Sequence, residues 1–270
     1  MSRSEEVEFD AEDEGSEASG RRPVRSRIAV LHDDDDLLVV SKPPSVWLDE
    51  SPDDVLSVIE QLEEAGLAGG DRPAQFIYPL DADVSGVLLA ARSDEAAENL
   101  QRQASTGSLG ISCLAMVRGP VMRNEGEMAL HLSPLPRGGG RMKIDGKGSE
   151  AHLKWKVVDH FIGFALLKCR TQPPYPHQVR ALLEGAGLPL AVDSLYGGAT
   201  ELRLSSFKAG YRPSRRHRER PLIERVSMHI DSAQCVHPRT GESMMFQAPA
   251  PKDFRAALHQ LERFGRMPSS

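Results

Sequence analysis

Short apolar runs separated by polar turns are the feature that most limits how this chain of 270 residues can fold. Residues 28–31 and 37–40 are apolar and flank the acidic segment 33–36, a pattern that predicts a β-hairpin. Further runs of strand type occupy residues 87–91, 112–117, 152–158, 164–170 and 226–236. No apolar run approaches 18 residues, so the sequence predicts no membrane-spanning helix.

Helical patterns are fewer than strand patterns. Ser51 and Pro52 are typical of an N-cap and a first helical residue, and they predict a helix that ends near Gly66. The other predicted helices run from Ser93 to about Ala104, from Pro176 to Gly185, and over residues 252–264. Because strands outnumber helices and mostly adjoin in hairpins, we predict an α+β fold with a mixed, mainly antiparallel sheet.

The charge of the chain is unevenly distributed. The net charge is −6, and residues 1–20 contribute −7 through eight acidic residues and one arginine, which leaves +1 for the other 250 residues. Residues 1–27 lack the large apolar side chains needed to offset the entropy of ordering, so we expect a disordered tail there. We expect one folded domain over residues 28–265 and a short C-terminal tail over 266–270.

The cysteines exclude several classes of protein. Cys113, Cys169 and Cys235 are odd in number and far apart, so neither a disulfide framework nor a common zinc spacing is present. The N-terminus carries no apolar stretch of a secretory signal. We therefore expect a cytoplasmic protein in a reducing compartment, with no membrane partner and no bound metal.

Two stretches rich in basic residues are candidates for nucleic-acid contact. The first contains Arg141 and Lys143 within a glycine-rich segment, and the second, residues 208–225, contains Arg215 and Arg216. Basic loops of this kind can follow a phosphate backbone. Either stretch taken alone is more typical of a solvated surface loop, but two in one domain favour RNA as the partner.

Six segments, in order, carry a family resemblance. They are residues 37–44 with Lys42-Pro43, residues 78–86 with Leu80-Asp81 and Ser85-Gly86, residues 111–119, residues 177–180 with His-Gln-Val-Arg, residues 193–197 with Asp-x-x-Tyr-Gly, and residues 225–249. Over about residues 28–255 the chain resembles the RNA pseudouridine synthases of the large-subunit-type A branch, the RluA-like family.

The resemblance implies a specific chemistry. Members of this family have a mainly antiparallel sheet with a central cleft and flip a uridine of structured ribosomal or transfer RNA into it, as enzymes that act on a base must. They use a single aspartate and need neither cofactor nor metal. By position the aspartate is Asp81 and its ion-pair partner is Arg180. A neighbouring guanidinium keeps such a carboxylate ionised. His177 and Gln178 match the segment that lines the site.

Several positions depart from the family pattern. The family arginine before Leu-Asp is Pro79, the family tyrosine that stacks on the target base falls on Cys113, and Gly-Arg-Thr before His177 is replaced by Pro-Tyr-Pro. Tyr78 and Tyr175 are the candidates for a substitute ring. Three hypotheses follow: a pseudouridine synthase acting as a monomer, a lapsed homologue that binds RNA or assists ribosome assembly, and an interaction protein that works through its acidic tail.

Overall fold

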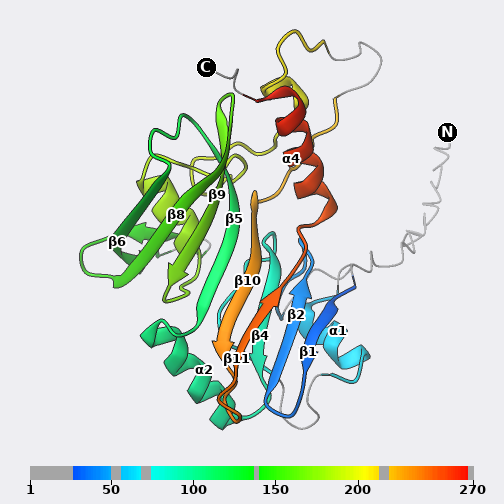
Figure 1. Ribbon diagram of the computed structural model, residues 1–270, viewed down its shortest axis with the longest axis vertical. Helices are drawn as coiled ribbons and strands as arrows, with labels where there is room; N and C mark the ends of the chain where they lie inside the picture. The colour runs from blue at the N-terminus through cyan, green and yellow to red at the C-terminus, as the bar shows by residue number, and fades with distance from the viewer. Residues whose placement is uncertain (1–26, 50–55, 68–73, 137–139, 213–218, 267–270) are drawn as a thin grey trace, which may run out of the picture.

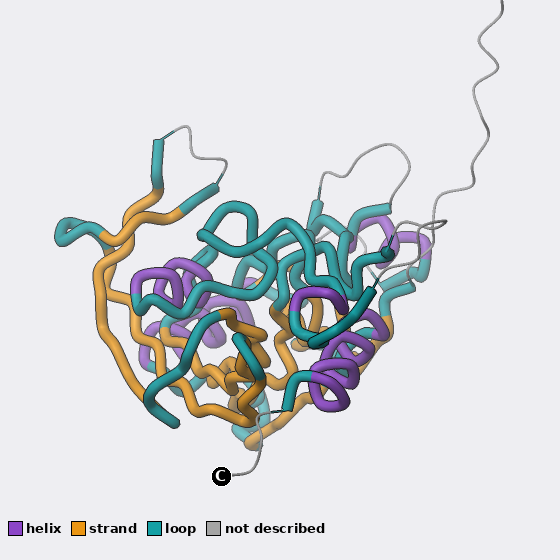
Figure 2. The backbone as a smooth tube through the Cα atoms, turned by 90° about the horizontal axis from the view of Figure 1, so that it is seen from above, coloured by secondary structure: helices purple, strands orange, loops and turns teal. Residues whose placement is uncertain are grey.

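The computed structural model describes residues 27–49, 56–67, 74–136, 140–212 and 219–266. Within these residues one sheet of eleven strands runs through the molecule, and its main path is β1-β2-β4-β10-β5-β9-β8-β6-β7 (Figure 1). The strands are β1 (Ala29–Asp33), β2 (Leu37–Lys42), β3 (Gln75–Phe76), β4 (Ser85–Ala91), β5 (Gly110–Arg118), β6 (Glu125–Pro134), β7 (Met142–Ile144), β8 (Ser149–Phe161), β9 (Phe164–Gln172), β10 (Met228–Val236) and β11 (Ser243–Gln247). Seen from above, the strands follow a curved layer (Figure 2).

Four α-helices in the described residues pack against this sheet. They are α1 (Val58–Glu64), α2 (Asp94–Thr106), α3 (Gln178–Gly185) and α4 (Lys252–Phe264). Helix α2 contacts β4 and β10, whereas α3 contacts β6 to β9. All but one of the strand pairings described are antiparallel, so the predicted α+β class with a mixed, mainly antiparallel sheet is confirmed.

The start of the first helix was predicted wrongly. Ser51 lies outside the described residues, and Leu56 and Ser57 precede the helix rather than belonging to it. The helix begins at Val58 because Ser57 and Glu60 form a reciprocal capping box: the Ser57 hydroxyl accepts the Glu60 N–H, and the Glu60 carboxylate accepts the Ser57 N–H. The predicted stop at Gly66 and the predicted cap at Ser93 agree with the structure.

The one parallel pairing among the described strands, between β4 and β10, sets the position of the strand that follows Asp81. Ser85 and Gly86 of β4 lie opposite His229 and Ile230 of β10. Gly86 has φ +128°, and a Cβ atom there would lie 2.0 Å from the carbonyl oxygen of Ile230. Only glycine allows this backbone conformation together with so close an approach. The pairing therefore holds the start of β4 against the middle of the sheet.

The sequence patterns missed part of the second half of the sheet. Strand β6, which pairs with β7 and β8, was not predicted, although Met128, Leu130 and Leu132 alternate with more exposed residues as in a strand with one solvated face. Strand β7 lies within the glycine-rich basic stretch that was interpreted as an RNA-binding loop. Apolar core residues lie between the sheet and helices α2 and α3, and a smaller cluster lies beneath α4. No helix in the described part of the chain combines the length and apolar character needed to cross a membrane.

Candidate active site

Asp81 lies in the turn that precedes β4. The turn is closed by the Val84 N–H, which donates to the Asp81 carbonyl (3.0 Å). Two cations bind the next carbonyls: Lys42 Nζ donates to Ala82 O (2.7 Å), and Arg225 Nη1 donates to Asp83 O (3.0 Å). Because the backbone on the C-terminal side of Asp81 is held on both carbonyls, the position of its side chain is determined by the surrounding structure.

Lys42 is the last residue of β2 and is 1% exposed. Its amine also donates to Pro43 O (3.0 Å). Burial lowers the pKa of Lys42 to about 7, although the nearby carboxylates of Asp81 and Asp83 act in the opposite direction. Two carbonyl acceptors match the two hydrogens of a neutral amine, so the contact persists in either protonation state.

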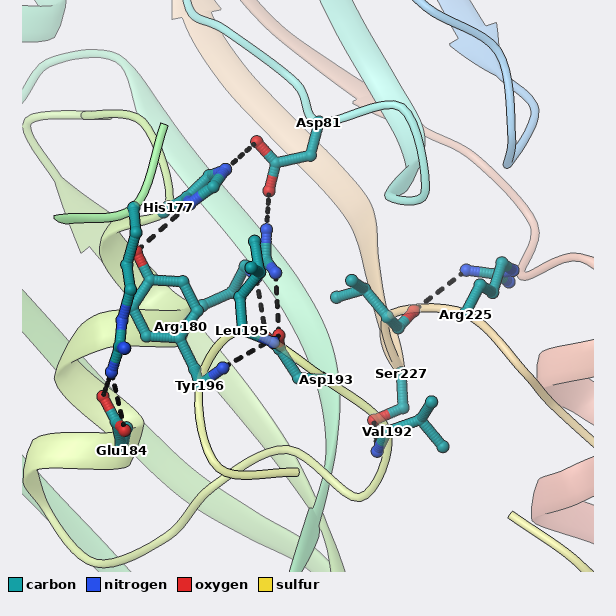
Figure 3. A network of polar contacts seen from close by, with 12 residues as sticks. Asp81, His177, Arg180, Glu184, Val192, Asp193, Leu195, Tyr196, Arg225 and Ser227 are labelled. Atoms are coloured by element: carbon teal, nitrogen blue, oxygen red, sulfur yellow. Dashed lines mark hydrogen bonds and ion pairs between the residues drawn. The ribbon is translucent and has the colours of Figure 1, made fainter. Parts of the chain in front are cut away.

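Arg180 and His177 bind the Asp81 carboxylate from the other side of the site (Figure 3). Arg180 Nη1 donates to Asp81 Oδ2 (2.8 Å), and His177 Nε2 lies 3.1 Å from Asp81 Oδ1. The rest of the Arg180 guanidinium binds Asp193 in a bidentate manner, with Nε and Nη2 each 2.7 Å from a carboxylate oxygen. Asp193 thus orients Arg180 while leaving one N–H group for Asp81.

The electrostatics keep Asp81 ionised. Burial would raise its pKa, but the hydrogen bond from His177 and the adjacent Arg180 guanidinium together lower the pKa below its usual value. The Asp81 side chain nevertheless keeps 19% of its surface exposed. A charged carboxylate that remains accessible in a largely buried setting can act as a nucleophile or as a base.

Asp81 borders a pocket that is partly open to solvent. Its walls include apolar side chains of β5 and β10 and both candidate tyrosines; the apolar residues are Ile111, Met228 and Ile230. Tyr78 is 3% exposed and its hydroxyl donates to Val87 O (2.6 Å), so it belongs to the core, which argues against its predicted use as a mobile substitute ring. Tyr175 is half-buried, and its ring borders the same pocket.

Cys113 lies beside the pocket, on the same face of β5 as Ile111. It faces Cys169 of β9 and Ile230 of β10 across the sheet and is 1% exposed. Contact with Cys169 and burial both raise the pKa of the Cys113 thiol. The thiol is therefore an uncharged packing group rather than a nucleophile.

Gln178 was predicted to contact RNA, and in the structure it borders the same pocket as Asp81 while its amide is bound within the protein. Its side chain is 2% exposed, its Nε2 donates to His152 O (2.9 Å), and its Oε1 accepts the Tyr175 N–H (2.9 Å). Both ends of the amide are used within the protein. Gln178 therefore shapes the segment that carries Tyr175 and His177, and its contact with RNA stays a prediction.

The predicted basic contacts are only partly brought to the site. Arg141 and Lys143 both lie on the β6–β7 hairpin. Arg141 Nη2 is 3.2 Å from Glu184 Oε1 of α3, and Lys143 Nζ is 2.7 Å from Asp145 Oδ2. Neither residue borders the pocket that contains Asp81. Arg215 and Arg216 lie outside the described residues.

The sequence interpretation did not assign a role to Lys42, Asp193 or Tyr196. Lys42 binds the backbone that follows Asp81, and Asp193 binds the guanidinium of Arg180. Tyr196 contacts His177. A signal was present, since all three lie in segments that match the family. Local sequence alone does not show which group each of them touches.

Among the described residues, one cluster has side chains that can act as metal ligands: His32, Asp34 and His237. His237 Nδ1 accepts the N–H groups of Arg239 and Thr240, so its hydrogen resides on Nε2 and is donated to Asp34 (3.0 Å). Asp34 also accepts the N–H groups of Asp36 and Leu37. With these groups used internally, the cluster joins the β1–β2 turn to the β10–β11 turn and does not fit a metal ion.

The site pairs a partly accessible aspartate with a buried arginine beside a pocket of a mainly antiparallel sheet, which is the arrangement expected of the family that the sequence motifs resemble. The model of the RNA pseudouridylate synthase family matches residues 36–185, more than half of the chain. The chain therefore belongs to the RNA pseudouridylate synthase family, as the sequence motifs had indicated.

Individual relatives agree with this family. The chain is 24% identical over 242 residues to an uncharacterized RNA pseudouridine synthase of Bacillus subtilis, covering 87% of this chain and 73% of that protein. It is 28% identical over 236 residues to ribosomal large subunit pseudouridine synthase C of Yersinia pestis, covering 87% and 69%. The solved structure of human RNA pseudouridylate synthase domain containing 4 has the same fold, with a TM-score of 0.63 at 18% identity, covering 89% and 94% of the two chains.

Proposed function

We propose that this protein isomerises a uridine of RNA to pseudouridine, with Asp81 as the group that acts on the ribose. The observation that carries the proposal is the ionised Asp81 carboxylate at the wall of a partly open pocket, bound by Arg180 and His177. A role limited to RNA binding has less support, because binding alone requires no such carboxylate.

The reaction balances without an added reactant. Asp81 attacks C1′ of the flipped nucleotide, forming an Oδ–C1′ bond as the N1–C1′ bond breaks, or it removes a ribose proton so that the uracil leaves by elimination. The freed uracil rotates and forms a C5–C1′ bond; the Oδ–C1′ bond breaks at this step, or, in the elimination route, the removed ribose proton is returned. The C5 proton is lost and N1 gains one. Arg180 and His177 stabilise the carboxylate as the charge on the leaving uracil changes.

We infer that Tyr175 supplies the ring that stacks on the target base. The position of the family tyrosine is occupied by the buried Cys113, and the Tyr78 hydroxyl is bound within the core. Tyr175 borders the same pocket as Asp81 and is half-buried, so its ring is available to a planar base. Stacking on an aromatic ring contributes about 1–3 kcal/mol per base.

Ribosomal RNA of the large subunit is the proposed substrate, because several relatives are named ribosomal large subunit pseudouridine synthases. Arg141 and Lys143 are proposed phosphate contacts, since Lys143 is exposed, Arg141 is half-buried, and both could exchange their acidic partners for phosphate. Arg215 and Arg216 remain predicted RNA contacts. A cytoplasmic location and a monomeric state also remain predictions.

The test is pseudouridine mapping of total RNA from cells that lack the gene, complemented with the wild type or with Asp81→Asn. We expect one or more uridines to lose modification in the deletion strain, to regain it with the wild type, and not to regain it with Asp81→Asn. Asp83→Asn is the matched control, because the same change two residues along the turn affects a carboxylate that does not border the pocket.

The outcomes distinguish the function classes. Rescue by Asp81→Asn would overturn the assignment of Asp81. An unchanged map in the deletion strain would overturn the enzyme proposal, and salt-sensitive RNA binding by the purified protein would then indicate a binding protein.

A further inference from the structure

Behind the pocket, Tyr196 contacts the imidazole that binds Asp81 (Figure 3). The Tyr196 side chain is fully buried and does not border the pocket, so it does not reach a substrate. Its hydroxyl accepts the N–H of Met142, the first residue of β7 (2.6 Å), and lies 3.1 Å from His177 Nδ1. Tyr196 thus connects the β6–β7 hairpin with the residue that contacts the nucleophile.

The donor and the acceptor can be assigned in each hydrogen bond that leads from Met142 through Tyr196 and His177 to Asp81. A backbone N–H can only donate, so the Tyr196 oxygen accepts from Met142. The buried hydroxyl hydrogen also needs an acceptor, and His177 Nδ1 is the one in contact with it. His177 then has its hydrogen on Nε2, which donates to Asp81 Oδ1.

The result at Asp81 is a carboxylate with one donor on each oxygen. Oδ1 faces His177 and Oδ2 faces Arg180, so rotation of the carboxylate would break both contacts. Each oxygen retains a lone pair for the reacting ribose. A fixed near-attack orientation of this kind is worth a large rate factor, and misplacement by about 1 Å can cost about 100-fold.

His177 adopts a backbone conformation that supports this interpretation. Its φ is +51°, which is unfavourable for a residue with a Cβ atom and persists only where surrounding contacts compensate. The His177 and Tyr196 rings meet edge to face at 5.6 Å. The Tyr196 ring is itself held by the guanidinium groups of Arg141 and Arg180, at 5.2 and 5.0 Å from its centre.

We propose that Tyr196 is a positioning residue for the nucleophile: it holds His177 as the tautomer with hydrogen on Nε2, and so ties the orientation of Asp81 to the backbone of β7. The inference rests on the proposed function of Asp81. The inference also extends the proposed function, because the basic β6–β7 hairpin, where RNA contact is proposed, becomes part of the structure that orients the reacting carboxylate.

The test is a double-mutant cycle in the wild-type background, measured as single-turnover modification of the RNA identified by mapping. Tyr196→Phe is expected to lower the rate constant at saturating RNA by about 10- to 100-fold, with the half-saturating RNA concentration changed less than twofold. His177→Gln retains a donor at the Nε2 position but loses the acceptor for Tyr196. If Tyr196 acts through His177, adding Tyr196→Phe to His177→Gln has no further effect on the rate.

The result that overturns the proposal is a full additional loss in the double variant, or an unchanged rate in Tyr196→Phe. His259→Gln on α4 serves as the matched control for a histidine replacement, since no contact joins it to this network.

A second measurement does not depend on activity. Nitrogen-15 NMR of the histidine side chains, with His177 assigned by its loss in His177→Gln, reports the tautomer directly. Hydrogen on Nε2 is expected, and hydrogen on Nδ1 would overturn the proposal even if Tyr196→Phe failed to fold. An inactive wild type with the expected tautomer would instead contradict the proposed function alone.

Discussion

At the scale of single residues, the site shows how buried charges are compensated by specific contacts. Asp81, Arg180 and Asp193 form a row in which one guanidinium serves two carboxylates. Breaking a buried pair by removing one partner leaves an uncompensated charge and costs about 3–5 kcal/mol. The same contacts that stabilise the fold therefore also keep Asp81 charged.

Lys42 makes stability depend on pH in a defined direction. Its pKa is lowered from 10.5 to about 7, so between these values the unfolded chain binds more protons than the folded one. The contribution of Lys42 to the free energy of unfolding therefore rises with pH in this window, by at most about 1.4 kcal/mol per unit. Below pH 7 the cost of burying the charge is fully present.

We predict that this dependence disappears in Lys42→Met. From pH 7 to pH 9 the free energy of unfolding of the wild type should rise relative to that of the variant by about 1 kcal/mol per pH unit, measured by urea unfolding at each pH. Lys252→Met, which changes an exposed lysine, should give a curve parallel to the wild type. Parallel curves for Lys42→Met would contradict the prediction.

At the scale of elements, helix boundaries follow from caps and not from the first favourable residue. Ser51-Pro52 has the composition of a helix start, yet α1 begins after Ser57. The reason is that Ser57 and Glu60 satisfy each other's backbone N–H groups. The spacing Ser-x-x-Glu was present in the sequence and is the signal that the prediction overlooked.

Ser57→Ala is expected to lower the free energy of unfolding by about 1 kcal/mol, because the Glu60 N–H loses its acceptor. The measurement is urea unfolding. Ser105→Ala provides the comparison: this exposed serine in the last turn of α2 bonds only a helix carbonyl, so its removal should change stability by a few tenths of a kcal/mol. Equal effects of the two replacements would argue against the capping box.

At the scale of the whole molecule, the sheet and the main core are continuous. Strand β10 joins β4, which follows the Asp81 turn, to β5, from which the sheet continues to β9. The main cluster of core residues includes side chains from both halves of the sheet. The active site lies where the halves meet, so its geometry depends on both of them.

A continuous core predicts a single cooperative unfolding transition. The two tryptophans of the chain report on different halves: Trp47 lies near the Asp81 turn, and Trp155 lies on β8. In Trp155→Phe and Trp47→Phe, which leave one reporter each, the fluorescence transition should coincide with the circular dichroism transition of the same protein. Separate transitions within one variant would mean that the halves unfold independently.

Much of the architecture followed from local patterns. Alternating and apolar runs identified the central strands, and the caps at Ser93 and Gly66 marked helix boundaries that the structure retains. Asp81 and Arg180 were predicted as a pair from the motifs that contain them. Strand β6 was missed because the alternation of Met128, Leu130 and Leu132 was overlooked. Strand β7 was missed because it has only three residues and lies within a stretch that was interpreted as a loop.

The sequence by itself determined most of the strands and the family, and it predicted Asp81 as the acidic group of the site. Only the tertiary structure decided that Asp193 orients Arg180, that Gln178 faces inward, and that Tyr175 rather than Tyr78 is available in the pocket. Asp81 and Arg180 are 99 residues apart. The direction of a side chain at such a junction depends on strand register and on a strained residue such as His177, and neither is determined by neighbours in the sequence.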